Sequence, residues 1–106
     1  MIVETKKGKL PVRYGMNALA HFGDLTGKSM NVVMQTMGEL GDMKLSELLA
    51  FVYAGFVDGA RFAETDCKVK SIEEVGDMMD DDSDLLNRMF DAFNGDSEEV
   101  EGSKKK

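Results

Sequence analysis

The chain has 106 residues, a net charge of −7, and 42% apolar and 31% charged residues. This length fits one small domain with its own core, and the composition argues against wholesale disorder. A free nucleic-acid binder of this size normally carries a net positive charge, so nucleic acid is not an expected partner. The single cysteine, Cys67, excludes an internal disulfide framework and fits a reducing compartment.

Neither a membrane partner nor a secretory signal is expected. The longest apolar run, Leu48–Val57, has ten residues, whereas a membrane-spanning helix needs about 20. No apolar stretch follows Lys6 and Lys7 near the N-terminus, as a secretory signal requires. The sequence therefore predicts a protein of the cytoplasm.

Residues 1–14 predict a β-hairpin. Two β-favouring segments, residues 2–5 and 10–14, flank Lys6–Lys9, in which Gly8 can supply the positive φ of a tight turn. Pro11 cannot donate a backbone hydrogen bond, so its strand should lie at an edge or turn that position away from its partner.

From residue 16 onward the hydrophobic period becomes helical. A first short helix should place Met16, Leu19 and Phe22 on its inner face and end at Gly23 and Gly27. A second should be capped by Ser29 and have one apolar face, composed of Met30, Val33, Met34 and Met37.

A third helix, capped by Asp42 or Ser46, is expected at the centre of the domain. Its apolar stripe consists of Leu45, Leu48, Leu49, Val52, Tyr53 and Phe56, broadened by Phe51, Val57 and Phe62. Gly55 and Gly59 would allow another helix to approach closely.

The last third predicts two short helices. Ser71–Glu74 forms a capping box that opens a helix with Ile72, Val75 and Met79 inward. Asp80–Ser83 interrupts the pattern, and Ser83 can cap a final helix that ends at Asn94-Gly95. The expected fold is thus a mainly α, single small helical domain over residues 1–95, with an N-terminal hairpin (1–14), helices over 16–94 and a disordered charged tail over 96–106.

No catalytic or metal-binding constellation is recognisable. His21 has no neighbouring nucleophile, and one His with one Cys cannot supply the roughly four ligands of a zinc site. Asp80, Asp82 and Asp84 resemble the start of a calcium loop, but Leu85 stands where that loop needs glycine. We expect no enzyme activity and no cofactor.

Methionine is unusually frequent, with nine residues. Methionine side chains adapt to varied apolar partners, although the same residues could simply fill the core. The candidate partner-binding residues are Met30, Met34 and Met37 together with Leu86, Met89, Phe90 and Phe93 of the last helix.

Arg13–Leu19 (RYGMNAL), followed by Phe22 and Thr26–Ser29, resembles the opening of the tail assembly chaperones of long-tailed bacteriophages, in which a short hairpin turns into the first helix. Leu48–Phe56 (LLAFVYAGF) is similar to the central helix of that family. The start of the helix at Ser71–Asp77 is similar too. The motif residues are Arg13, Tyr14, Gly15, Met16, Asn17, Leu19, Phe22, Tyr53 and Gly55.

The resemblance implies a non-enzymatic, homo-oligomeric protein of the bacterial host cytoplasm that is absent from the mature virion. Such chaperones coat the helical, aggregation-prone tape-measure protein and help to recruit tail-tube subunits. Many are also made in a longer, frameshifted form, and the codons of Lys104–Lys106 could supply the slip site.

The uneven distribution of charge along the chain supports a second hypothesis. Residues 1–13 have a net charge of +3, whereas residues 71–101 have twelve acidic residues and only Arg88, a net charge of −11. The chain could therefore be a small acidic adaptor or inhibitor that binds a basic protein through residues 71–101. Its binding would fall steeply with salt, whereas apolar binding would not.

Overall fold

The computed structural model describes residues 1–94 and confirms a helical domain with an N-terminal two-stranded antiparallel hairpin. The predicted tail, 96–106, lies outside the described residues. The elements are β1 (Ile2–Thr5), β2 (Gly8–Pro11), α1 (Met16–Thr26), α2 (Met30–Gly38), the 3-10 turn η1 (Leu40–Asp42), α3 (Leu45–Phe62), α4 (Ile72–Asp81) and α5 (Leu85–Asn94).

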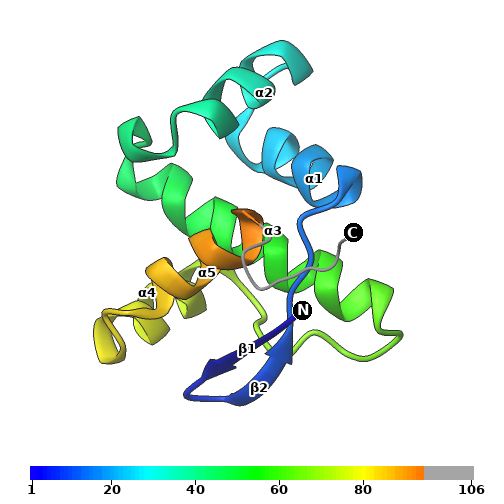
Figure 1. The fold of residues 1–106 in the computed structure, drawn as a ribbon, viewed down its shortest axis with the longest axis vertical. Coiled ribbons are helices and arrows are strands. Elements are labelled where there is room, and N and C mark those ends of the chain that lie inside the picture. Colours follow the sequence, from blue (N-terminus) through cyan, green and yellow to red (C-terminus); the bar gives the residue numbers. More distant parts are fainter. Residues whose placement is uncertain (95–106) are drawn as a thin grey trace.

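The long helix α3 is the centre of the domain. It contacts α1, α4, α5 and β2, whereas α2 packs mainly against α1 and η1. In Figure 1, α2 therefore lies at one end of the molecule and the hairpin lies at the other. The core along α3 includes Phe51, Val52 and Phe56, all almost completely buried.

The hairpin confirms the predictions for Gly8 and Pro11. Gly8 has a φ of +105° at the turn. Pro11 pairs with Ile2, next to the hydrogen-bonded pair of Met1 and Val12, so its position faces away from β1. β2 ends at Pro11, earlier than predicted, because the chain then turns to α3, where the Arg13 N–H donates to the Gly55 carbonyl (3.1 Å).

Helix α1 starts at Met16 as predicted, but two other predictions for it were wrong. It runs through Gly23 and ends at Gly27, whose φ is +74°. Gly23 is buried because the helix backbone passes close to its neighbours there: an added Cβ would lie 3.2 Å from the Lys28 carbonyl oxygen. Met16 is 65% exposed, because Ala18 and Phe22, one turn apart, form the buried face instead.

The predicted cap of α2 is confirmed, whereas the predicted caps of α3 were wrong. Ser29 caps α2, accepting from the Val32 N–H. For α3 the predicted caps, Asp42 and Ser46, were wrong: Asp42 belongs to η1, and the Lys44 N–H before the helix donates to Glu47 Oε1 (3.1 Å). The outermost residues of the predicted stripe, Leu45 and Phe62, are 66% and 64% exposed because they are the two ends of the helix.

The start of α4 confirms one half of the capping box. Ser71 Oγ accepts from the Glu74 N–H (3.1 Å), whereas the Glu74 carboxylate accepts from the Lys70 N–H. The helix buries Val75 and Met78, and Ile72 and Met79 are partly buried against the core, so the predicted inward residues are confirmed and Met78 joins them.

The predicted interruption is shorter than expected. Helix α4 continues to Asp81, which leaves three residues before α5. There Asp82 Oδ1 accepts from the Asp84 N–H (3.2 Å), and the residue directly before α5 is Asp84, not the predicted cap Ser83.

Candidate partner-binding surface

A buried carboxylate joins the N-terminal segment to α3. Asp58 is 2% exposed and is the only buried charged residue within residues 1–94. Its Oδ2 accepts from the Gly15 N–H (3.2 Å) and from Arg13 Nη1 (3.3 Å). Its Oδ1 accepts from Arg61 Nε (3.2 Å) and Nη2 (2.7 Å). One side chain thus fixes the turn into α1 against the centre of the domain.

These contacts keep Asp58 ionised. Burial raises the pKa of Asp58, but hydrogen bonds from Arg61 and the Gly15 N–H and the charges of Arg13 and Arg61 outweigh it. The pKa therefore lies below the ordinary value of an aspartate. The guanidinium of Arg13 also lies 4.4 Å from the centre of the Phe62 ring, a cation–π contact that holds it in place.

Tyr14 and two glycines complete this junction. The Tyr14 hydroxyl donates to the Phe51 carbonyl (2.9 Å), and the two rings stack with their centroids 4.4 Å apart. Burial raises the pKa of Tyr14, so the hydroxyl remains a donor. A Cβ on Gly55 would lie 2.4 Å from Tyr14 Cζ, and one on Gly59 would lie 2.3 Å from the Pro11 carbonyl oxygen.

The glycines therefore admit the N-terminal segment rather than a second helix, which corrects the prediction for Gly55 and Gly59. We use "the junction" for the contacts among residues 11–15, Phe51, Gly55 and residues 58–62. Asp58, which directly follows the apolar run Leu48–Val57, was not among the predicted residues. The available signal was an acidic residue within an otherwise apolar helical segment, three residues before Arg61.

Most of the residues that carry the family resemblance lie at the junction, in the core or packed against the core. Arg13, Tyr14, Gly15 and Gly55 meet at the junction. The others are distributed between core and surface: Phe22 is buried, Leu19 and Tyr53 pack against the core, and Met16 and Asn17 are exposed.

The α1–α2 arm, residues 16–38, has a different surface. Its only charged residues are Asp24 and Lys28. Five of its large hydrophobic side chains are exposed: Met16, Leu25, Met30, Val32 and Met34. Because α2 packs mainly on α1 and η1, its other side is open in Figure 1. Met30 and Met34 are one turn apart and share one face of α2, and an exposed apolar face is typical of a protein-binding site.

The structure separates the predicted partner-binding residues into two groups. Met30 and Met34 are 46% and 52% exposed. Met37 and Met89 are buried, so the prediction of a surface role was wrong for these two, which fill the core beneath α2 and α5. The remaining three, Leu86, Phe90 and Phe93, are partly buried against the core, with the rings of Phe90 and Phe93 next to Phe51.

Part of the acidic segment is neutralised within the chain. Lys7 pairs with Glu74 (3.0 Å) and Lys6 with Asp81 (3.7 Å). Arg88 binds Asp82 and also donates to the Glu4 carbonyl oxygen of β1. The contrast in charge between the two ends of the sequence therefore reflects, in part, the docking of a basic hairpin beside acidic helices.

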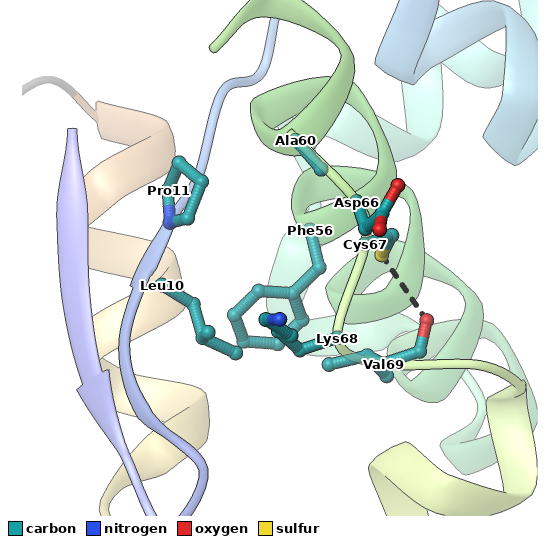
Figure 2. A pocket seen from close by; sticks show the side chains of 8 residues that line it. All are labelled: Leu10, Pro11, Phe56, Ala60, Asp66, Cys67, Lys68 and Val69. Atoms are coloured by element: carbon teal, nitrogen blue, oxygen red, sulfur yellow. Dashed lines mark hydrogen bonds between the residues drawn. The ribbon is translucent and has the colours of Figure 1, made fainter. Parts of the chain in front are cut away.

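The segment after α3 encloses a very small cavity, shown in Figure 2. Its volume of about 10 Å³ is near the minimum for one water molecule. The Cys67 thiol beside it donates to the Val69 carbonyl (3.1 Å). This site therefore lacks the space for a cofactor or a substrate.

His21 packs beside Tyr53 of α3. Within residues 1–94, its Nε2 atom is buried without a hydrogen-bond partner, and its ring lies 5.8 Å from that of Tyr53. In residues 1–94, no three His, Cys, Asp or Glu side chains are grouped so as to hold a metal ion. None of the helices described there is both long and apolar enough to cross a membrane.

Comparison with known proteins adds no relative. No family model, curated protein or solved structure matches this chain. The exposed arm and its surroundings are therefore the basis on which a function can be proposed.

Proposed function

We propose that the chain is a non-enzymatic tail assembly chaperone of a long-tailed bacteriophage. It binds and solubilises the tape-measure protein in the bacterial host cytoplasm, helps to recruit tail-tube subunits, works as a homo-oligomer and leaves before the virion matures. The observation that carries the proposal is the α1–α2 arm, which exposes Leu25, Met30, Val32 and Met34 and has only two charged residues of its own, Asp24 and Lys28.

The arm has the chemistry that a long apolar helix needs in a partner. Methionine side chains have three rotatable bonds and a polarizable sulfur, so Met30 and Met34 can adapt to different apolar side chains along such a helix. The net charge of −7 would keep the resulting complex dispersed. A helix-in-groove or helix-on-helix contact is the recognition mode that fits these features.

The resemblance supports the proposal in a specific way. The two similar segments, Arg13–Leu19 and Leu48–Phe56, lie next to each other in the fold, where Tyr14 stacks on Phe51 and a Gly55 carbonyl accepts from Arg13. Their sequence patterns are thus two sides of one structural contact, which explains why they would occur together in a family that shares this fold.

The alternative, an acidic adaptor acting through residues 71–101, has less support. Glu74, Asp81 and Asp82 in that segment already bind Lys7, Lys6 and Arg88 of the same chain. Charges already paired in this way contribute less to the attraction of a basic partner.

A pull-down from phage-producing cells tests the proposal. The tagged chain is recovered at low and at high salt, and bound proteins are identified by mass spectrometry. We expect the tape-measure protein to be retained at both salt concentrations, because apolar contacts are not screened. Recovery of only basic proteins that are lost at high salt would contradict the chaperone proposal and favour the adaptor.

A matched pair of arm variants makes the test specific. Replacing Met30 and Met34 by serine should remove the tape-measure protein from the eluate, whereas replacing the polar neighbours Asn31 and Gln35 by serine should not. Equal recovery by both variants would show that the arm is not the binding surface.

A further inference from the structure

A groove opens beside the arm, where the end of α1 meets the starts of α3 and α4. It has a volume of about 530 Å³, within the usual range of about 300–1,000 Å³ for binding pockets. Its apolar lining comes from all three helices and consists of Leu25, Leu49, Ala50 and Ile72. Lys44, Glu47 and Glu73 lie around it.

The groove shares one side chain with the arm. Leu25 both lines the groove and is one of the exposed hydrophobic residues of the arm. A partner seated in the groove would therefore also contact the arm at Leu25. Three helix ends enclosing an apolar floor are a shape that receives the apolar face of another helix.

The charges around the groove indicate what should flank that apolar face. Glu47 is neutralised by Lys28 (2.9 Å), and a hydrogen bond from Lys28 is the main reason that the pKa of Glu47 lies below its usual range. In residues 1–94, Glu73 forms no ion pair, nor do Glu39 and Asp42, which line an adjoining hollow that shares Glu47 with the groove. The linings of the groove and the hollow together contain four acidic residues (Glu39, Asp42, Glu47 and Glu73) against Lys28 and Lys44, a net charge of −2, so this side of the molecule is acidic.

We propose that this groove seats one amphipathic helix of the partner, with apolar residues spaced i, i+3 or i+4, and i+7 and flanked by lysine or arginine. The apolar side chains enter between Leu25, Leu49 and Ile72, and the basic ones face Glu73 and the acidic hollow. This inference rests on the proposed function, since the tape-measure protein would supply the helix, and it adds that only basic-flanked segments of that protein are seated here.

Binding of two designed peptides to the full chain, followed by fluorescence anisotropy, tests the proposal. Both peptides are 18-residue helices with the same leucine stripe, and lysine flanks the stripe in one while glutamate flanks it in the other. We expect the lysine peptide to bind about tenfold more tightly, because like charges at the rim repel the glutamate peptide. Equal affinity for the two peptides, or no binding of either, would overturn the proposal.

Variants of the chain then test whether the peptide binds in the groove. Glu73→Lys should remove most of the preference for the lysine peptide, whereas Asp91→Lys, an exposed charge reversal on α5, should leave it unchanged. Leu25→Ser should weaken both peptides by about tenfold, and its thermal unfolding shows whether the fold is intact. If Leu25→Ser and Glu73→Lys both bind like the wild-type chain, the groove is not the site.

The experiments distinguish a wrong assignment of the groove from a wrong proposal of function. If the groove variants still retain the tape-measure protein in the pull-down, only the groove assignment is wrong. If the wild-type chain binds the lysine peptide but never retains a tape-measure protein, the groove is correct as a helix site and the chaperone function is wrong.

Discussion

The junction and the α1–α2 arm differ in what they bury. The junction buries a charged side chain against α3, whereas the arm exposes apolar side chains. At the junction the buried carboxylate of Asp58 accepts from Arg13, Gly15 and Arg61. In the arm, the side chains of Met30, Val32 and Met34 are exposed. The junction fixes the fold, and the arm is left available to bind.

The residues that resemble the chaperone family and the residues proposed to bind the partner lie in different parts of the molecule. Arg13, Tyr14, Gly15 and Gly55, which carry much of the resemblance, lie at the junction, where they determine how the hairpin meets α3. The exposed apolar residues of α2 lie outside the two longer similar segments. The resemblance therefore rests on residues that determine the architecture, and not on the residues proposed to bind the partner.

The largest effect is expected at Gly59. Gly59→Ala places a methyl group 2.3 Å from the Pro11 carbonyl oxygen, so the N-terminal segment must move away from α3. We expect the free energy of unfolding to fall by about 3 kcal/mol, measured by urea denaturation. The control is Gly38→Ala in α2, where an added Cβ meets nothing within 4 Å. That variant should be about 0.5–1 kcal/mol more stable than the wild type, because alanine favours a helix. Similar losses in both variants would mean that the junction is not tightly packed.

Asp58→Asn should have the next largest effect. It removes the negative charge between Arg13 and Arg61, and we expect a loss of about 2–3 kcal/mol in the free energy of unfolding. The expected loss lies below that of a fully buried pair because both arginine side chains are partly exposed.

The same variant should change the response to acid. Because the folded-state pKa of Asp58 is lowered, its stabilisation is complete above the ordinary aspartate pKa of about 4 and is lost as pH falls through the lower folded value. Denaturation curves between pH 7 and 2 should show a smaller loss of stability in Asp58→Asn than in the wild type. Asp91→Asn, an exposed control on α5, should follow the wild-type curve; identical pH dependence in all three would contradict this role of Asp58.

A smaller, stabilising effect is expected just beyond the junction. Glu64 has a φ of +58°, and the Thr65 N–H after it donates to the Ala60 carbonyl (3.0 Å), so α3 ends in a motif that favours glycine. Glu64→Gly should raise the free energy of unfolding by about 0.5–1 kcal/mol, measured by thermal denaturation. Ala63→Gly, at a φ of −81°, should instead lower it; a gain in both variants would show that the left-handed conformation is not the cause.

The smallest effect on stability is expected in the arm. Met30→Ser with Met34→Ser removes two exposed side chains, so the free energy of unfolding should change by less than about 0.5 kcal/mol. A loss of several kcal/mol in thermal or urea denaturation would mean that these methionines belong to the core after all, and the contrast between arm and junction would disappear.

Much of the fold was predictable because it depends on local patterns. Gly8, Ser29 and Ser71 act within a few residues of their own positions, and the structure confirms all three. The periodicity of α3 correctly placed Phe51, Val52 and Phe56 in the core.

The errors came from contacts between distant segments. Met37 and Met89 share the sequence pattern of exposed methionines, and only the packing of α2 on α1 and of α5 on the core distinguishes them from Met30 and Met34. Asp58 depends on Arg13, 45 positions away. The groove combines the ends of three helices, which no local pattern reveals.

The methyl resonances of the methionines provide the most direct test, because exposed and buried methionines occur in the same chain. The chain, labelled with ¹³C at the methionine methyl groups, is titrated with a helical fragment of the tape-measure protein from the same phage. We expect the signals of Met30 and Met34 to shift while those of the buried Met78 and Met89 keep their positions. Shifts confined to Met79 of the acidic helix α4, with Met30 and Met34 unchanged, would contradict the account and place the binding surface on the acidic side of the molecule.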